Sequence, residues 1–117
     1  MPRLDLYTDY RLFVTVQLVE DEIHIGRGPE CGVQLPDDRV SRNHAVIRRR
    51  GERHEIEDTS LNGTRLNDRI LAKPTELAPG DRIYIEQFVL IYQPDGAPPE
   101  ELGDRTTELD APWPGRK

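Results

Sequence analysis

Cysteine and aromatic residues are scarce in this chain, and long apolar runs are missing. The single cysteine, Cys31, excludes an intramolecular disulfide framework and a multi-cysteine zinc site, and it fits a reducing, cytoplasmic compartment. Two Phe, four Tyr and one Trp supply few rings for stacking on nucleic-acid bases. The chain contains no run of 18 apolar residues, so the sequence predicts no membrane insertion.

Charge is unevenly distributed along the 117 residues, whose formal net charge is -6. Residues 39–53 contain six Arg against a single Glu, whereas residues 94–117 contain six acidic residues against three basic ones. A local basic stretch in an acidic chain indicates a small anionic ligand, because a long polyanion usually requires a face that is basic overall. We therefore expect no nucleic-acid partner.

Short strands separated by turns account for residues 12–93. Apolar residues alternate with others over 12–19, and further short strands are expected at 23–25, 33–35, 44–50, 53–58, 64–66, 70–71, 82–86 and 88–92. Residues 88–92 are apolar on both faces, which is typical of a buried central strand. Because no segment sustains a 3.6-residue period, the pattern predicts an all-β fold, specifically a β-sandwich.

The last part of the chain differs in character. The stretch Pro94-Asp95-Gly96-Ala97-Pro98-Pro99 has no hydrophobic period and cannot form a core. We therefore expect one domain over residues 1–93 and a disordered, acidic, proline-containing tail over residues 94–117. Trp113, which lies between two prolines, is either an isolated exposed ring or part of a short docking motif.

Three predicted loops, residues 26–28, 39–44 and 58–64, carry most of the hydrogen-bonding groups. Each adjoins a predicted strand, so all three can gather at one end of a sandwich. They offer guanidinium groups, a hydroxyl, an amide side chain and glycine backbone N–H groups, a set that suits a phosphate dianion. No base is poised for catalysis, so we expect neither an enzyme nor a cofactor.

These loops contain the ordered motifs Gly26-Arg27, Ser41-Arg42-Asn43-His44 and Ser60-Leu61-Asn62-Gly63-Thr64, followed by Asn67. Together with the later Leu77-x-x-Gly80-Asp81-x-Ile83, this order resembles the forkhead-associated (FHA) domain family over roughly residues 10–93. The resemblance implies a sandwich of two twisted sheets, about eleven short strands and recognition loops at one end. It also implies binding of phosphothreonine peptides.

The resemblance also assigns roles to individual residues of the expected binding site. Arg27 matches the arginine that bonds the phosphate, Ser41 the hydroxyl that donates to it, and Arg42 the next phosphate-contacting position. Asn62 matches the amide that grips the peptide main chain. Arg39 lies where the family often reads the third residue after the phosphothreonine, and we expect it to select an acidic one.

A second group of residues matches the family's loop architecture. Its members are expected to shape the loops without touching the ligand: Gly26, His44, Gly63, Thr64 and Asn67. Leu61 departs from the pattern, because many members have Thr or Ser there and leucine cannot donate a hydrogen bond. We expect one side-chain contact to phosphate fewer, with the backbone N–H of Leu61 still available.

The leading hypothesis is a phosphothreonine-dependent protein–protein interaction module in kinase-linked signalling. Its partner would be a threonine-phosphorylated protein or peptide, with a Ser/Thr kinase in the pathway. The alternative, which Leu61 favours, is a structural or assembly module of the same fold that binds an unphosphorylated protein. Because Asp110 follows Thr107 by three residues, phosphorylated Thr107 would fit the preference expected of Arg39. The tail therefore predicts phosphorylation-dependent self-association through a second copy.

Two other chemistries are disfavoured by the sequence. Ser41, His44 and Asp58 could form a hydrolase triad, but no nucleophile elbow surrounds Ser41 and no oxyanion loop is evident. The three histidines come from separate segments without a recognisable metal-ligand spacing, so we expect no metal site.

Overall fold

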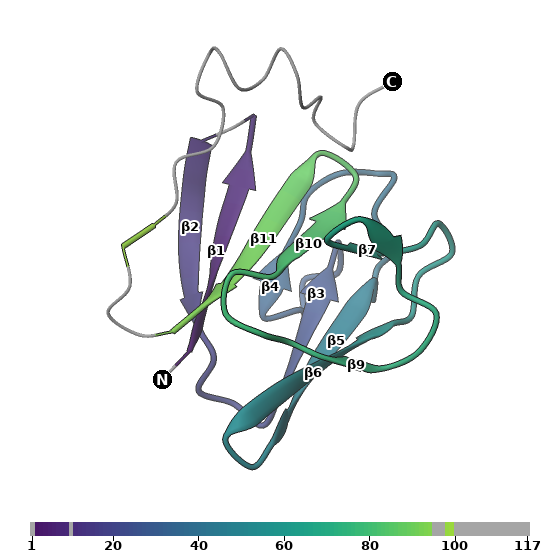
Figure 1. Ribbon diagram of the computed structural model, residues 1–117. Coiled ribbons are helices and arrows are strands. Elements are labelled where there is room, and N and C mark those ends of the chain that lie inside the picture. The colour runs from purple at the N-terminus through teal and green to yellow at the C-terminus, as the bar shows by residue number, and fades with distance from the viewer. Residues whose placement is uncertain (1, 10, 95–97, 100–117) are drawn as a thin grey trace.

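The computed structural model describes residues 2–9, 11–94 and 98–99, and over these residues the chain is a sandwich of two β-sheets (Figure 1). The six-stranded sheet has the order β2 (Arg11–Gln17), β1 (Arg3–Thr8), β11 (Phe88–Gln93), β10 (Arg82–Ile85), β7 (Arg65–Leu66) and β8 (Arg69–Ile70). The five-stranded sheet has the order β4 (Val33–Gln34), β3 (Glu22–Gly26), β5 (Ala45–Arg50), β6 (Arg53–Asp58) and β9 (Thr75–Glu76). The predicted all-β sandwich is confirmed. The described residues include no helix that could cross a membrane.

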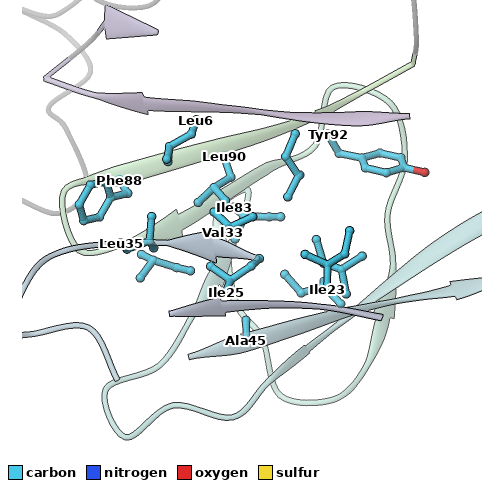
Figure 2. Packing of buried hydrophobic residues seen from close by; sticks show 14 of the residues in the cluster. Leu6, Ile23, Ile25, Val33, Leu35, Ala45, Ile83, Phe88, Leu90 and Tyr92 are labelled. Carbon is cyan, nitrogen blue, oxygen red and sulfur yellow. The ribbon is translucent and has the colours of Figure 1, made fainter. Parts of the chain in front are cut away.

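The core lies between the two sheets, where alternate residues of facing strands interdigitate (Figure 2). Leu6 of β1 and Leu90 of β11 pack from the six-stranded sheet, and Ile25 of β3 and Ala45 of β5 pack from the other. These four side chains are 0–1% exposed. Full burial of a leucine or isoleucine side chain contributes about 1.5–3 kcal/mol, so this layer fixes how the sheets, and hence the loops at their ends, are placed.

The predicted central strand at residues 88–92 is confirmed by β11, which pairs with β1 on one side and with β10 on the other. All six residues of β11 are buried. Phe88, Leu90 and Tyr92 face the core, whereas Val89 and Ile91 belong to a separate apolar cluster with Tyr7 of β1. β11 is therefore buried on both faces, as its sequence predicts.

The sequence did not predict strand β1. It predicted a strand over most of β2, but the alternating apolar residues of β2 are not buried in the core as that pattern implies. In β1, Arg3 and Asp5 form a buried ion pair, with Arg3 Nε 2.7 Å from Asp5 Oδ1. The strand β2 is an edge strand and none of its residues is fully buried, with Phe13 63% exposed. Alternation alone does not distinguish an edge strand from a core strand.

The two ends of β11 lie next to different parts of the molecule. The turn between β10 and β11 contains Glu86, at φ 52°, and Gln87, whose side chain accepts a hydrogen bond from Arg39. At the other end of β11, Gln93 pairs with Arg3, and the Arg3 guanidinium donates to the carbonyl of Pro94 at 2.9 Å. Most of the predicted tail, including Thr107 and Trp113, lies outside the described residues.

Candidate functional site

Three loops meet at one end of the sandwich: the β3–β4 loop (27–32), the β4–β5 loop (35–44) and the β6–β7 loop (59–64), together called the loop cluster here. The N–H of Arg27 donates to the Ser41 carbonyl at 2.9 Å, and the N–H of Leu61 donates to Ser41 Oγ at 3.2 Å. Asn62 Nδ2 donates to the carbonyl of Arg39 at 3.1 Å. The gathering of these loops, which the sequence predicts, is therefore present.

Gly26 permits the closest approach within the loop cluster. A Cβ atom at this position would lie 2.3 Å from the carbonyl oxygen of Arg42 and 2.8 Å from that of Ser41. Those are backbone atoms, which cannot turn aside as a flexible side chain can. The glycine thus lets the β4–β5 loop lie against the end of β3, where Gly28 N–H also donates to the Arg42 carbonyl at 3.1 Å.

His44 joins two loops from a fully buried position. Its Nδ1 accepts a hydrogen bond from the Ser41 N–H at 3.0 Å, and its Nε2 lies 2.9 Å from the Gly63 carbonyl oxygen. A backbone N–H can only donate and a carbonyl can only accept, so the ring is the neutral tautomer with its proton on Nε2. Both ring nitrogens are therefore committed to backbone groups.

A second network, centred on Asp58, forms the β6–β7 loop. Its Oδ1 accepts hydrogen bonds from the Ser60 hydroxyl at 2.6 Å and from the buried Thr64 hydroxyl at 2.7 Å. Ser60 Oγ in turn accepts from the N–H of Gly63, which has φ 96°. The motif resemblance predicts architectural roles for Gly63 and Thr64. It does not predict one for Asp58, which is the central acceptor of this network.

The exposed groups of the loop cluster are cationic or can donate hydrogen bonds. Arg27 is anchored by its Nε, which donates to the Val40 carbonyl at 3.0 Å. The exposed Arg42 forms no hydrogen bond or ion pair through its guanidinium with a described residue. Ser41 Oγ accepts from the Leu61 N–H and keeps its own proton for another acceptor. The Leu61 N–H, expected to be available for phosphate, is thus bonded to Ser41.

Arg39 is held by acidic and amide neighbours in the same region. Its guanidinium donates to both carboxylate oxygens of Asp37 at 3.1 Å and to Gln87 Oε1 at 2.6 Å, and it lies 3.6 Å from Glu86. The side-chain and backbone hydrogen bonds from Arg39 lower the pKa of Asp37 to about 2. Asp37 therefore remains a carboxylate throughout the neutral range and competes with any ligand carboxylate for Arg39.

Asn67 lies apart from the other predicted architectural residues. It occupies the β7–β8 turn with φ 56°, its Nδ2 donates to Asp81, and its Oδ1 accepts from the N–H of Arg82 at 3.0 Å. It therefore connects the β7–β8 hairpin to the start of β10, and its hydrogen bonds within the described part of the chain go to Asp81 and Arg82. Cys31 also lies in the loop cluster, with its Sγ 3.1 Å from the Arg42 carbonyl oxygen.

The geometry also bears on the two disfavoured chemistries. A hydrolase triad needs a histidine nitrogen on the serine hydroxyl and a carboxylate on the other nitrogen. Here the His44 nitrogens contact the backbone of Ser41 and Gly63, and Asp58 bonds Ser60 and Thr64 instead. In the described part of the chain, no group of three or more His, Cys, Asp or Glu residues is arranged to hold a metal ion.

Comparison with known sequences adds to this description. The family model of the FHA domain matches residues 23–86, which include all three loops. An oxoglutarate dehydrogenase inhibitor from Corynebacterium jeikeium is 43% identical over 68 residues, covering 57% of this chain and 46% of that protein. The chain spans about half the length of the curated relatives that it matches.

Solved structures with the same fold include other FHA domains. The FhaA FHA domain, crystallised with the intracellular domain of another protein, is 35% identical, with a TM-score of 0.72 over 80% of this chain and 100% of that one. A second structure, from work on phosphothreonine-dependent FHA domain interactions, is 33% identical, with a TM-score of 0.70 over 81% of this chain and 99% of that one.

Proposed function

The chain belongs to the FHA domain family, and we propose that it binds threonine-phosphorylated proteins through its loop cluster. The observation that carries this proposal is that the three loops containing Arg27, Ser41 and Asn62 are hydrogen-bonded to one another at one end of the sandwich. We propose that Arg27, Ser41 and Arg42 contact the phosphate, and that Asn62 binds the peptide backbone. Binding, and not catalysis, is the proposed activity.

The chemistry of these groups suits a phosphate monoester. A phosphothreonine carries about -1.5 to -2 charges at pH 7 and three acceptor oxygens. The Arg27 and Arg42 guanidinium groups supply charge-assisted donors, and the Ser41 hydroxyl proton supplies one more. At roughly 1.5–3 kcal/mol each, three to four such bonds offset the ordering of a flexible peptide and leave a dissociation constant in the micromolar range, roughly -8 kcal/mol.

The partners follow from this chemistry. The interaction requires a Ser/Thr kinase to create the ligand, and we place both in the cytoplasm, a setting that the free Cys31 thiol supports. One candidate ligand is Thr107 of this chain, once phosphorylated, presented to a second copy. Its Asp110 would then face Arg39, which must exchange its contact with Asp37 for the incoming carboxylate.

One feature favours the second candidate function, binding of an unphosphorylated protein. The Leu61 side chain is 95% exposed beside Ser41, where a hydroxyl is usual in the family. An apolar side chain in full contact with water at the proposed site gains about 25 cal/mol per Å² that a partner covers. Leu61→Thr separates the two candidates, because it should strengthen a phosphate-dependent interaction and weaken an apolar one.

The deciding experiment is a calorimetric titration of the full chain with a degenerate phosphothreonine peptide library and with its unphosphorylated copy. The proposal expects saturable binding of the first and none of the second, at an ionic strength of about 0.15 M, where weak surface attraction is screened. Equal binding of both libraries would establish the alternative. Binding of neither library would reject phosphothreonine recognition by this chain.

A further inference from the structure

The six-stranded sheet ends in a free edge along β2. In the described part of the chain, β2 pairs with β1 on one side and with no strand on the other (Figure 1). No described loop forms a backbone hydrogen bond with Arg11–Gln17 either. The backbone N–H and C=O groups along the outer side of β2 are therefore available to pair with a further strand.

Apolar side chains are concentrated along this edge. Six large apolar side chains are exposed among the described residues, and four of them belong to β2 or follow it closely: Leu12, Phe13, Val14 and Val19, which are 42–63% exposed. Edge strands are usually protected from pairing by charged side chains or by being short. The strand β2 is seven residues long and has one charged residue, Arg11, at its first position. It therefore lacks the usual protection by charge.

We propose that β2 pairs with β2 of a second copy of this chain, in antiparallel orientation about a two-fold axis, so that two six-stranded sheets join into one continuous sheet. The pairing uses backbone hydrogen bonds, as when an extended segment is added to an exposed sheet edge. No residue of β2 belongs to the loop cluster, so the proposal is independent of phosphopeptide binding and of any phosphorylation.

The register of β2 against β1 indicates which part of the edge pairs. The alignment shifts between Leu6 and Tyr7, where β2 contains one residue more than β1, at Phe13. A bulge of this kind bends the strand locally and disturbs the ladder of hydrogen bonds. From Val14 to Gln17 the register is regular, and these residues carry no charge. We therefore assign the contact to the second half of β2.

This half of the strand is complementary to itself. Val14 and Val16 lie opposite Leu6 and Leu4 of β1, which face the core, whereas Thr15 points to the other face of the sheet. A two-fold axis through Thr15 places Val14 of each copy opposite Val16 of the other and the two Thr15 residues opposite each other. Cross-strand pairs of β-branched residues, including pairs of threonines, stabilise antiparallel sheets.

The charges at the ends of β2 favour the same orientation. Arg11 begins the strand, and Glu20 follows its end by three residues. Both are exposed, and neither forms an ion pair with a described residue. Antiparallel pairing brings Arg11 of each copy toward the end of the other strand, where Glu20 lies. Parallel pairing would instead place the two Arg11 side chains next to each other, which is unfavourable.

The experiment is sedimentation equilibrium of the full, unphosphorylated chain over a range of concentrations. We expect the mass to rise from that of one copy to that of two. Val14→Lys should increase the dissociation constant of the dimer by about tenfold or more, because each dimer then carries two ammonium groups at the joined edge. Hydrogen exchange of the parent chain provides a second measurement. Those amides of Val14–Gln17 that point away from β1 should exchange more slowly as the concentration rises.

The matched control is Ile70→Lys, which places the same charge on an exposed β-branched residue of β8, at the opposite edge of the same sheet. It should dimerise as the parent does, and so should Arg27→Ala at the loop cluster. Far-UV circular dichroism establishes that each variant is folded. A parent chain that is monomeric at every concentration would overturn the proposal. A dimer that forms without slowing the exchange of the β2 amides would also overturn it, because association would then use another surface. This second criterion holds even if Val14→Lys does not fold.

Discussion

Two arginine-rich regions lie next to each other in the sequence and behave differently in the structure. The arginines of β5 and β6 each form an ion pair with a carboxylate of a neighbouring strand or turn, and the pairs are Arg48–Glu22, Arg49–Asp21, Arg50–Glu55 and Arg53–Glu76. In the loop cluster, Arg27 and Arg42 form no ion pair with a described residue.

The difference shows that a run of like charge in a sequence is not a patch of potential on a surface. Neighbouring strands and turns supply a carboxylate to each sheet arginine, so the +5 of residues 39–53 is largely neutralised beyond residue 47. Arg27 and Arg42, which lie in loops, have no such counter-charge among the described residues, whereas the loop arginine Arg39 is paired with Asp37. The positive field available to an anionic ligand is therefore centred on Arg27 and Arg42.

The strongest test of this difference is to remove one arginine from each region and to measure phosphopeptide binding. Arg27→Ala should weaken phosphopeptide binding by about 3 kcal/mol or more, since it deletes charge-assisted bonds to a dianion, while the melting temperature stays close to that of the parent. Calorimetric titration measures the affinity. The matched Arg50→Ala should bind as the parent does, and equal losses in the two variants would show that only bulk charge matters.

A second prediction concerns how the loop region is held in place. His44→Ala should lower the free energy of unfolding by about 2–3 kcal/mol, because it leaves the Ser41 N–H and the Gly63 carbonyl without their partner. Chemical denaturation measures the change. His24→Ala, at a half-exposed histidine that contacts Glu22, is the control and should cost much less. An unaltered denaturation midpoint for His44→Ala would refute the architectural role.

A third prediction distinguishes the other buried histidine. His54 Nδ1 lies 2.9 Å from the Tyr92 hydroxyl, and its Nε2 has no partner among the described residues. Burial, followed by the charge of Arg49, lowers the pKa of His54 below its ordinary value of 6.5. The folded state therefore binds this proton less readily than the unfolded state, so stability is full above pH 6.5 and declines as the pH falls through the folded pKa.

Each unit by which the pKa of His54 is lowered corresponds to about 1.4 kcal/mol of stability lost on acidification. Unfolding free energies measured between pH 7.5 and about pH 5 test this, with His54→Phe as the comparison. The variant should show a shallower dependence on pH over that range. Identical slopes for both proteins would assign the acid sensitivity to other groups.

The smallest expected effect is at Arg39, which has features of both regions because it is a loop arginine with an acidic partner. A peptide with Asp at the third position after phosphothreonine should bind better than one with Lys by only about 0.2–1 kcal/mol, and less in high salt. Asp37→Asn should increase this preference by releasing Arg39 from its carboxylate. Equal binding of the Asp and Lys peptides at low salt would remove Arg39 from the specificity site.

The fold class and the meeting of the loops could be predicted because they depend on local patterns. Short apolar runs, turn residues and motif order each leave a signal within a few positions. The strand β1 left no such signal, because Arg3 and Asp5 become compatible with burial only when each neutralises the other. The exposure of β2 was also not predictable, since position at a sheet edge depends on which strands pair.

Within the site, the donors and acceptors could be identified from the sequence, but their pairing could not. The sequence shows that Ser41, His44 and Asp58 are polar, but it does not show which groups each of them contacts. Only the distances show that His44 bonds backbone groups and that Asp58 serves Ser60 and Thr64. The hydrogen bond from Arg39 to Asp37 likewise depends on the path of the β4–β5 loop, which no residue pattern in the sequence specifies.

The pairing of β1 with β11 has a consequence for how the chain is made. Arg3 lies opposite Gln93, so β1 finds one of its two neighbours only after β11 has been synthesised. Until then β1 and β2 are a lone hairpin, which is marginally stable in water. The six-stranded sheet therefore closes only once β11 is available, and its many distant pairings place its folding in the millisecond-to-second range typical of β-sandwiches.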